Sequence, residues 1–204
     1  MESILPGSLV LLYNLGELHQ GVVISANRNS AEVQFPDGSV LQLPCARFCL
    51  ISLLPMDAAD AEGSLSRFNS AVREEYNALD PVSIAKKMPS AAGCNWDELC
   101  ALSEMDSDAK RFALFYLIKD HPELFYRKKE LFFSRDEAER ASFAETEARQ
   151  KERIEYLAIA AEIMTRVSSG ADLQTLQRDF APAVLNQFRL ELSEILLYNQ
   201  HPDL

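Results

Sequence analysis

Residues 31–43 read AEVQFPDGSVLQL, and this stretch indicates the architecture of the N-terminal part of the chain. Its first five residues alternate apolar and polar side chains, a period of two that is typical of a strand with one buried face. The turn that follows begins with Pro36, which fixes its own φ, and contains Gly38, which can adopt a positive φ without strain. The stretch therefore predicts two antiparallel strands joined by a tight turn.

Short β-rich runs of the same kind continue as far as residue 55. The expected strands are residues 8–13, 19–25, 31–35, 39–43 and 48–53. Turn-forming sequences separate them, among them Asn14-Leu15-Gly16 and Asn27-Arg28-Asn29. Five short strands in so few residues are typical of a small barrel of the SH3-like or Tudor-like kind, and we expect residues 1–55 to form one.

The pattern becomes helical from Met56 onward. An apolar stripe with helical spacing runs from Phe68 to Leu79. Asp80-Pro81 should end this helix, because proline disfavours helical geometry in the residue before it. We therefore assign residues 56–90 to a helical linker.

Residues 91–134 combine two helices with a pair of short strands. Asn95 and Glu98 have the spacing of a capping box that opens a short helix, and a second, more apolar helix should start near Asp106 or Ser107. Two β-rich segments follow, joined by a charged turn. Helix, helix and hairpin in this order are the layout of a winged helix.

The last part of the chain, residues 135–204, is expected to be helical. Ser134-Arg135-Asp136-Glu137 reads as a capping box with acidic residues in the first turn, where the helix dipole favours them. The helix that it opens should run to Val167, about 50 Å in length, before it stops at Ser168-Ser169-Gly170. Two shorter helices should follow, over residues 172–180 and 183–199. The expected fold class is therefore α+β, with a small SH3-like β-barrel, a winged-helix domain and a long helical arm.

The charge balance narrows the choice of partners. The chain has 31 acidic and 20 basic side chains among its 204 residues, a net charge of −11. This balance argues against a surface that coats nucleic acid broadly, because phosphate binding needs clustered positive charge, but it leaves room for one local basic patch. No apolar run approaches the roughly 18 residues of a membrane span, and the first residues do not form a secretory signal. We expect a cytoplasmic protein without membrane contact, whose four cysteines are free thiols.

The sequence offers few candidates for catalytic or metal-binding residues. The histidines, His19, His121 and His201, lie at a turn, before a proline and in the C-terminal tail, and none has an evident carboxylate partner. The acidic run from Asp57 through Asp60 to Glu62 could hold a divalent ion, but we interpret it as an ordinary acidic loop because no second cluster is near it. We therefore name no catalytic residue, no metal ligand and no cofactor in this chain.

The best candidates for a binding site lie in the expected hairpin. Arg127-Lys128-Lys129 is the most basic triplet of the chain, and at a hairpin tip it could reach phosphates or simply form a solvated turn. Phe125 and Tyr126 are adjacent on a strand, so one of them must face away from the core. Tyr126, beside Arg127, is the better candidate for stacking on a base, although such aromatic residues often only fill a core. The apolar helix before the hairpin looks buried and is a poor reader of a DNA groove.

The order of these parts is similar to that of a known family. The chain opens on LPGSLV at residues 5–10, continues with the capped WDEL of residues 96–99, and has LFYRK at 124–128 and LFFSR at 131–135 before a long charged helix. Over residues 5–165 it resembles the N-terminal accessory region of ribonuclease II family 3′–5′ exoribonucleases, in the branch where an SH3-like barrel and a winged helix replace the usual cold-shock domains.

The resemblance implies a role in RNA degradation in which this chain does not catalyse. The family's catalytic domain holds magnesium with a cluster of aspartates, but Leu54 and Gly63 flank the acidic run where more aspartates would be expected. We expect an RNA-binding, substrate-guiding region that serves a catalytic ribonuclease domain in cis or in trans. Its ligand would be single-stranded RNA, held by Tyr126, Arg127, Lys128 and Lys129, and magnesium would be needed only by the catalytic domain.

Two other functions are compatible with the sequence. A protein-interaction adaptor would use the C-terminal helices, above all the apolar second half of the long helix, to dock a partner or a second copy. Direct enzymatic activity would require magnesium-dependent trimming of RNA by the pure protein.

Overall fold

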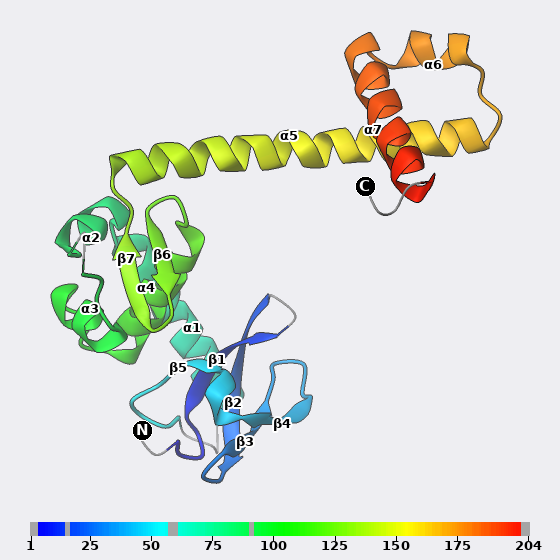
Figure 1. Cartoon of the computed structure of the whole chain (residues 1–204). Coiled ribbons are helices and arrows are strands. Elements are labelled where there is room, and N and C mark those ends of the chain that lie inside the picture. Colours follow the sequence, from blue (N-terminus) through cyan, green and yellow to red (C-terminus); the bar gives the residue numbers. More distant parts are fainter. Residues whose placement is uncertain (1–3, 15–16, 57–60, 90–91, 201–204) are drawn as a thin grey trace. The chain divides into compact units, whose positions relative to one another are not determined.

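The hairpin predicted from residues 31–43 is present, as part of a five-stranded antiparallel sheet. The computed structural model describes residues 4–14, 17–56, 61–89 and 92–200, and the chain divides into two compact units, residues 1–140 and 141–204. In the described part, the first unit contains the sheet, several helices and a second hairpin, whereas the second unit is helical (Figure 1). The α+β class expected from the sequence is confirmed at this level.

The sheet follows the predicted strands closely. Its members are β1 (Leu9–Asn14), β2 (Glu17–Ala26), β3 (Ser30–Gln34), β4 (Val40–Pro44) and β5 (Phe48–Ile51), in the spatial order β4-β3-β2-β1-β5. One turn of 3-10 helix, η1 (Cys45–Arg47), leads from β4 into β5. In the β3–β4 turn Gly38 has a φ of +83°, and the Asp37 carboxylate accepts a hydrogen bond from the Ser39 N–H at 2.9 Å, as the turn chemistry predicts. The turn expected at Asn14-Leu15-Gly16 includes residues outside those described.

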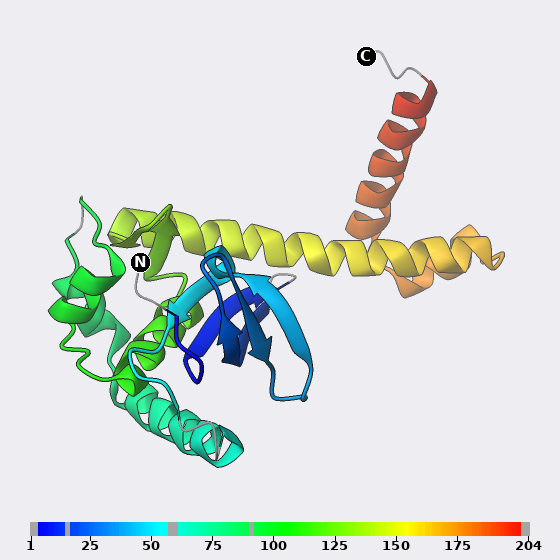
Figure 2. The same cartoon turned by 90° about the horizontal axis from the view of Figure 1, so that it is seen from below.

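Strand β1 is buried on both faces of the sheet. Successive residues of a strand point to opposite faces, yet all four residues of the run LVLL are almost inaccessible to solvent. Val10 and Leu12 pack in a cluster formed by residues of the sheet, whose strands curl in space (Figure 2). Leu9 and Leu11 pack with Leu50 of β5 against the helices of the same unit. One face of β1 therefore shares an apolar core with helices of the first unit, and the other face contributes to a separate core formed by the sheet.

Helices of the first unit follow the sheet along the chain. They are α1 (Ala61–Ala78), α2 (Pro81–Lys87), α3 (Trp96–Leu102) and α4 (Asp108–Asp120). The predicted break at Asp80-Pro81 does end α1, but it also starts α2. The Asp80 carboxylate accepts hydrogen bonds from the N–H groups of Val82 and Ser83, and Pro81 occupies the first helical position, where a missing N–H is harmless. The capping box predicted for α3, between Asn95 and Glu98, is confirmed.

Helix α4 occupies the centre of the first unit. Leu114, Leu117 and Ile118 pack in the core beneath the second hairpin. Its other buried residues pack against β1, β5 and α1, where the rings of Phe68 and Phe112 meet edge to face with centroids 5.1 Å apart. The prediction that this helix is buried is confirmed.

The second hairpin consists of β6 (Phe125–Lys128) and β7 (Leu131–Ser134) and lies against α4 (Figure 1). Cys94, just before α3, extends it by one bridge. The Cys94 N–H donates to the Phe132 carbonyl at 2.9 Å, and the Phe132 N–H donates back to the Cys94 carbonyl at 2.8 Å. The segment before α3 is thus tied directly to the edge of the hairpin.

The capping box that opens the long helix α5 (Glu137–Ser168) lies two residues later in the sequence than predicted. The box is formed by Asp136 and Glu139, each of which accepts a hydrogen bond from the other's N–H, and not by the Ser134-Glu137 pair. Ser134 is buried at the end of β7 and is unavailable for capping. The predicted stop is correct, because α5 ends at Ser168 and Gly170 follows with a φ of +87°.

The second unit contains most of α5 together with α6 (Leu173–Asp179) and α7 (Pro182–Gln200). Arg166 of α5 donates to the Asp179 carboxylate at 2.6 Å, and its guanidinium lies 5.0 Å from the centre of the Phe180 ring. Arg153 of α5 donates to Glu191 of α7 at 2.6 Å. Within the part of the chain that the structure describes, no helix is both long and apolar enough to cross a membrane.

Candidate nucleic-acid interface on a two-faced hairpin

The β6–β7 hairpin presents two faces of different chemistry. The cross-strand pairs are Phe125 with Ser134, Tyr126 with Phe133, Arg127 with Phe132 and Lys128 with Leu131. Phe125 and Phe132 are buried in the core, so the face that carries them is the inward face. Because side chains alternate along a strand, Tyr126, Lys128 and Phe133 lie on the opposite, outward face.

A stack of planar groups lies on the outward face. The rings of Tyr126 and Phe133 are stacked, with centroids 5.0 Å apart and planes inclined by 11°. The guanidinium of Arg135 lies 4.9 Å from the centre of the Tyr126 ring and donates from Nε to the Pro122 carbonyl at 2.9 Å. Gly93 lies against the other ring of the stack, since a Cβ on this residue would be 2.6 Å from an atom of Phe133. Neighbours therefore hold the stack in place before any ligand binds.

Two lysines adjoin this stack. Lys128 and Lys129 are exposed, and Lys128 shares the outward face with Tyr126, two residues before it. Lys129 begins the two-residue turn and has a φ of +58°, a left-handed conformation that is unusual for a residue with a side chain. The outward face thus combines planar groups with positive charge at its tip.

Arg127 does not belong to the outward face. Its Nε donates to the Lys129 carbonyl at 2.9 Å and its Nη2 donates to the Glu130 carboxylate at 3.2 Å. Its guanidinium lies 5.4 Å from the centre of the Phe132 ring on the inward side. The hairpin therefore places Tyr126 and Lys128 on one face and Arg127 on the other, a division that the period of two along the strand could have predicted, while Lys129 lies in the turn between the strands.

A cavity of about 400 Å³ lies beside Arg127, and we call it the hairpin cavity. Its walls come from Cys49 of β5, from the residues 95–98 that open α3, and from Arg127, Glu130 and Phe132 of the hairpin. Burial raises the pKa of the Cys49 thiol, and the charge of Arg127 opposes this effect only in part. The cavity therefore holds a protonated thiol, an aromatic wall and groups of both charges.

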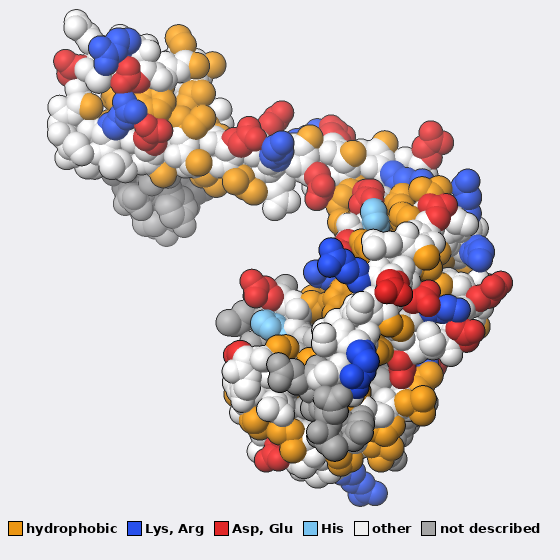
Figure 3. Space-filling model, turned by 180° about the vertical axis from the view of Figure 1, so that it is seen from behind, with side chains coloured by type: hydrophobic (Ala, Val, Ile, Leu, Met, Phe, Trp, Pro, Cys, Tyr) orange, Lys and Arg blue, Asp and Glu red, His pale blue; other side chains and the backbone are white. Residues whose placement is uncertain are grey.

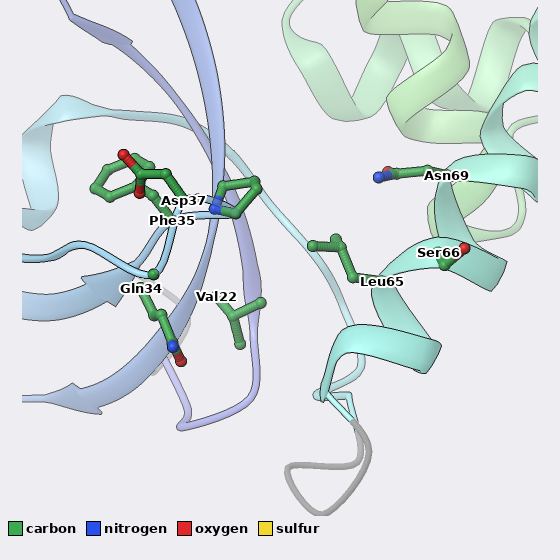
Figure 4. Close-up of a pocket in the computed structure, with 9 residues that line it drawn as sticks. Val22, Gln34, Phe35, Asp37, Leu65, Ser66 and Asn69 are labelled. Carbon is green, nitrogen blue, oxygen red and sulfur yellow. The ribbon is translucent and has the colours of Figure 1, made fainter.

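Another cavity, of about 710 Å³, lies elsewhere in the first unit, between the β3–β4 turn and α1. Phe35 and Asp37 line it on one side, and Leu65 and Asn69 of α1 line it on the other (Figure 4). None of the described residues that line it is a lysine or an arginine. It therefore lacks the positive charge that a phosphate needs.

The structure also places the residues that were considered for catalysis. His121 follows α4 and its Nδ1 lies 2.7 Å from the Glu123 carboxylate, so the expectation that it has no carboxylate partner is wrong. Asp57 and Asp60, the Glu62 side chain and His201 lie outside the described residues. Among the residues that are described, no group of three or more histidine, cysteine or acidic side chains could hold a metal ion.

The surface charge is mixed. On the face shown in Figure 3, lysine and arginine side chains are interspersed with aspartate and glutamate and do not gather in one broad field. A local site such as the hairpin is thus a better candidate for nucleic acid than the surface as a whole.

No family model matches this chain, and no curated protein or solved structure matches it either.

Proposed function

We propose that the outward face of the β6–β7 hairpin binds single-stranded RNA. The observation that carries this proposal is the Tyr126–Phe133 stack with Arg135 against it and Lys128 and Lys129 beside it. Single-stranded nucleic acid is bound by aromatic and guanidinium planes that stack on bases and by cations that contact the backbone. The hairpin supplies both kinds of group within a few residues.

Burial of α4 favours a single strand over a duplex. A winged helix that reads duplex DNA inserts the helix before its hairpin into the major groove. Here that helix is covered by the hairpin on one side and by β1, β5 and α1 on the other. It has no face left for a groove, and a single strand on the hairpin needs none.

Two features of the fold support a role beside a ribonuclease. Strand β1 lies between β2 and β5, with a 3-10 turn before β5, an arrangement that suits an SH3-like barrel. The order α2, Cys94 bridge, α3, α4 and hairpin suits a winged helix. We infer that this pair of modules guides RNA toward the catalytic domain of a ribonuclease II-like 3′–5′ exoribonuclease, which acts in cis or in trans.

Fluorescence anisotropy with labelled oligo(A) at low and moderate salt tests the proposal. A double variant, Lys128→Ala with Lys129→Ala, removes two positive charges from the tip of the hairpin and should weaken binding about tenfold at low salt. Two fewer phosphate contacts should also lower the slope of log affinity against log salt by about 1.4.

The matched control is Arg149→Ala with Lys151→Ala, which removes the same charge from α5 in the second unit. This control should keep at least most of the affinity. Absence of binding by the unmodified protein at low salt, or equal losses in the two double variants, would refute the proposal.

An adaptor function has one observation in its favour. Ile154, Leu157 and Met164 of α5 are 60%, 48% and 46% exposed, although Tyr156 and Ile163 of the same helix are buried. An exposed apolar stripe of this kind is typical of a helix that docks on a partner. Light scattering after size exclusion tests this alternative, because a strictly monomeric protein with salt-sensitive RNA affinity would leave it without support.

A further inference from the structure

We propose that the hairpin cavity binds a nucleobase that carries an exocyclic amino group, as adenine and cytosine do. The proposal rests on the proposed function for its class of ligand. It adds a second contact point, on the side of the hairpin away from the Tyr126 stack, where a base and not a phosphate is held.

The shape and lining of the cavity suit a planar, uncharged ring. About 400 Å³ is within the range of small-molecule sites and larger than one base requires. Trp96 and Phe132 form an aromatic wall, with ring centroids 5.5 Å apart, and the Arg127 guanidinium lies over Phe132. A guanidinium plane held over a ring offers a base a surface for stacking.

The charges that line the cavity select against phosphate. Asp97, Glu98 and Glu130 supply three carboxylates to the lining and Arg127 one positive charge, while Arg111, outside the lining, lies 3.7 Å from Asp97. One carboxylate oxygen of Glu98 accepts the Asn95 N–H in the capping box, whereas the side chains of Asp97 and Glu130 are 88% and 89% exposed. Carboxylates accept hydrogen bonds from amino groups and repel phosphates. Adenine should therefore bind better than uracil, which has no amino group.

An unmet polar group lies in the same wall. The Nε1 atom of Trp96 is shielded from solvent and makes no hydrogen bond within the described part of the chain. Buried indole N–H groups usually find a partner. A base acceptor that moves the ring slightly on binding would supply one.

The position of the cavity connects it with the outward face. Arg127 and Lys128 are neighbours on β6 and point to opposite faces of the hairpin. A strand that passes over the tip can therefore place its backbone beside the lysines and one base in the cavity. Loss of either contact should leave the other in place.

The protein contains one tryptophan, and it lies in this cavity, so its fluorescence reports on the site directly. Free nucleosides are the probes, because they carry no phosphate and do not need the outward face. Adenosine should change Trp96 fluorescence in a saturable way, with an affinity about tenfold higher than that of uridine. Salt should not alter this affinity, since the ligand is uncharged.

Two variants of one residue and a matched control test the role of the guanidinium. Arg127→Ala should weaken adenosine binding about tenfold, and Arg127→Lys should weaken it similarly because it keeps the charge but loses the plane. Lys128→Ala removes the same charge from the opposite face and should leave adenosine affinity unchanged. Circular dichroism should show that all three variants keep the fold.

The outcomes separate this proposal from the proposed function. If adenosine produces no saturable change, or binds no better than uridine, the cavity assignment is overturned, even where oligo(A) binds to the hairpin. If adenosine binds as expected while oligo(A) shows no affinity at low salt, the cavity assignment stands and the RNA function fails.

Discussion

Removal of the Asp108 carboxylate should loosen the attachment of the sheet to α4. Asp108 is the first residue of α4, and its two carboxylate oxygens accept hydrogen bonds from the N–H groups of Leu53 and Leu54, at 2.7 and 3.1 Å. Leu53 and Leu54 lie just beyond β5, where the chain leaves the sheet. One side chain thus joins two segments that are more than fifty residues apart in the sequence.

The size of the effect follows from these two bonds. A hydrogen bond to a charged group contributes about 1.5 to 3 kcal/mol, but both donors here are near the surface and can turn to water, so the lower figure applies. Asp108→Ala should therefore lower the free energy of unfolding by about 2 kcal/mol, because the two bonds are not independent. Asp108→Asn keeps one acceptor and should cost about 1 kcal/mol. The larger loss corresponds to a fall in Tm of about 4 to 8 °C.

Urea unfolding followed by the fluorescence of Trp96 measures the loss, since this residue packs against Phe115 and Phe132 in the core of the same unit. Asp106→Ala is the matched control, because Asp106 pairs with Lys110, at 2.8 Å on the surface. An exposed pair of this spacing contributes about 0.5 kcal/mol or less. Equal losses for Asp108→Ala and Asp106→Ala would refute the proposed attachment.

Three further variants test the packing of the first unit by the same urea assay. Gly21→Ala should cost about 1 to 3 kcal/mol, because the added Cβ would lie 2.3 Å from a methyl of Val33, whose side chain is fully buried. Lys129→Gly should raise stability by about 0.5 to 1 kcal/mol, because it relieves a left-handed conformation at a φ of +58°. Burial raises the pKa of Cys100 from 9.0 to about 11, so the folded protein keeps this thiol proton over a range where the unfolded chain releases it. Stability should therefore fall as pH rises between these values, and Cys100→Ala should flatten that fall.

The controls for these variants are equally specific. Gly38→Ala has open space around its Cβ but a φ of +83°, so any loss there reports strain and not crowding. A Lys129→Gly protein no more stable than the unmodified one would contradict the strain assigned to the turn. An unchanged pH profile in Cys100→Ala would show that this thiol does not contribute to the alkaline loss.

Local chemistry made much of the fold predictable. The turn at Gly38, the capping box of Asn95 and Glu98 and the helix stop before Gly170 depend on residues a few positions apart. The predictions were incomplete or wrong where two local patterns competed. Asp80-Pro81 satisfies the rule for a helix end and also the rule for a helix start, and both apply here. Ser134 fits a capping pattern, but its place in β7 buries it.

Contacts between distant segments were not predictable in the same way. The apolar sequence of α4 indicated burial, but nothing in it identified β1 and β5 as its cover. The hairpin shows the same limit. Because Phe125 and Tyr126 are neighbours on one strand, the sequence predicted that their side chains face opposite sides of the hairpin. The cavity beside Arg127 could not be predicted in this way, because Cys49 and the start of α3 also line it. Its lining comes from three separate parts of the chain.

Photocrosslinking tests the central claim, that single-stranded RNA lies on the outward face of the hairpin, most directly. Oligo(A) carrying one azidoadenosine would be irradiated with the full chain, and the modified residues would be identified by mass spectrometry. The predicted result is an adduct on Tyr126, Phe133 or Arg135 that is lost in the double variant of Lys128 and Lys129. Adducts confined to other parts of the chain, or no adduct above the level of an unrelated protein, would contradict the claim.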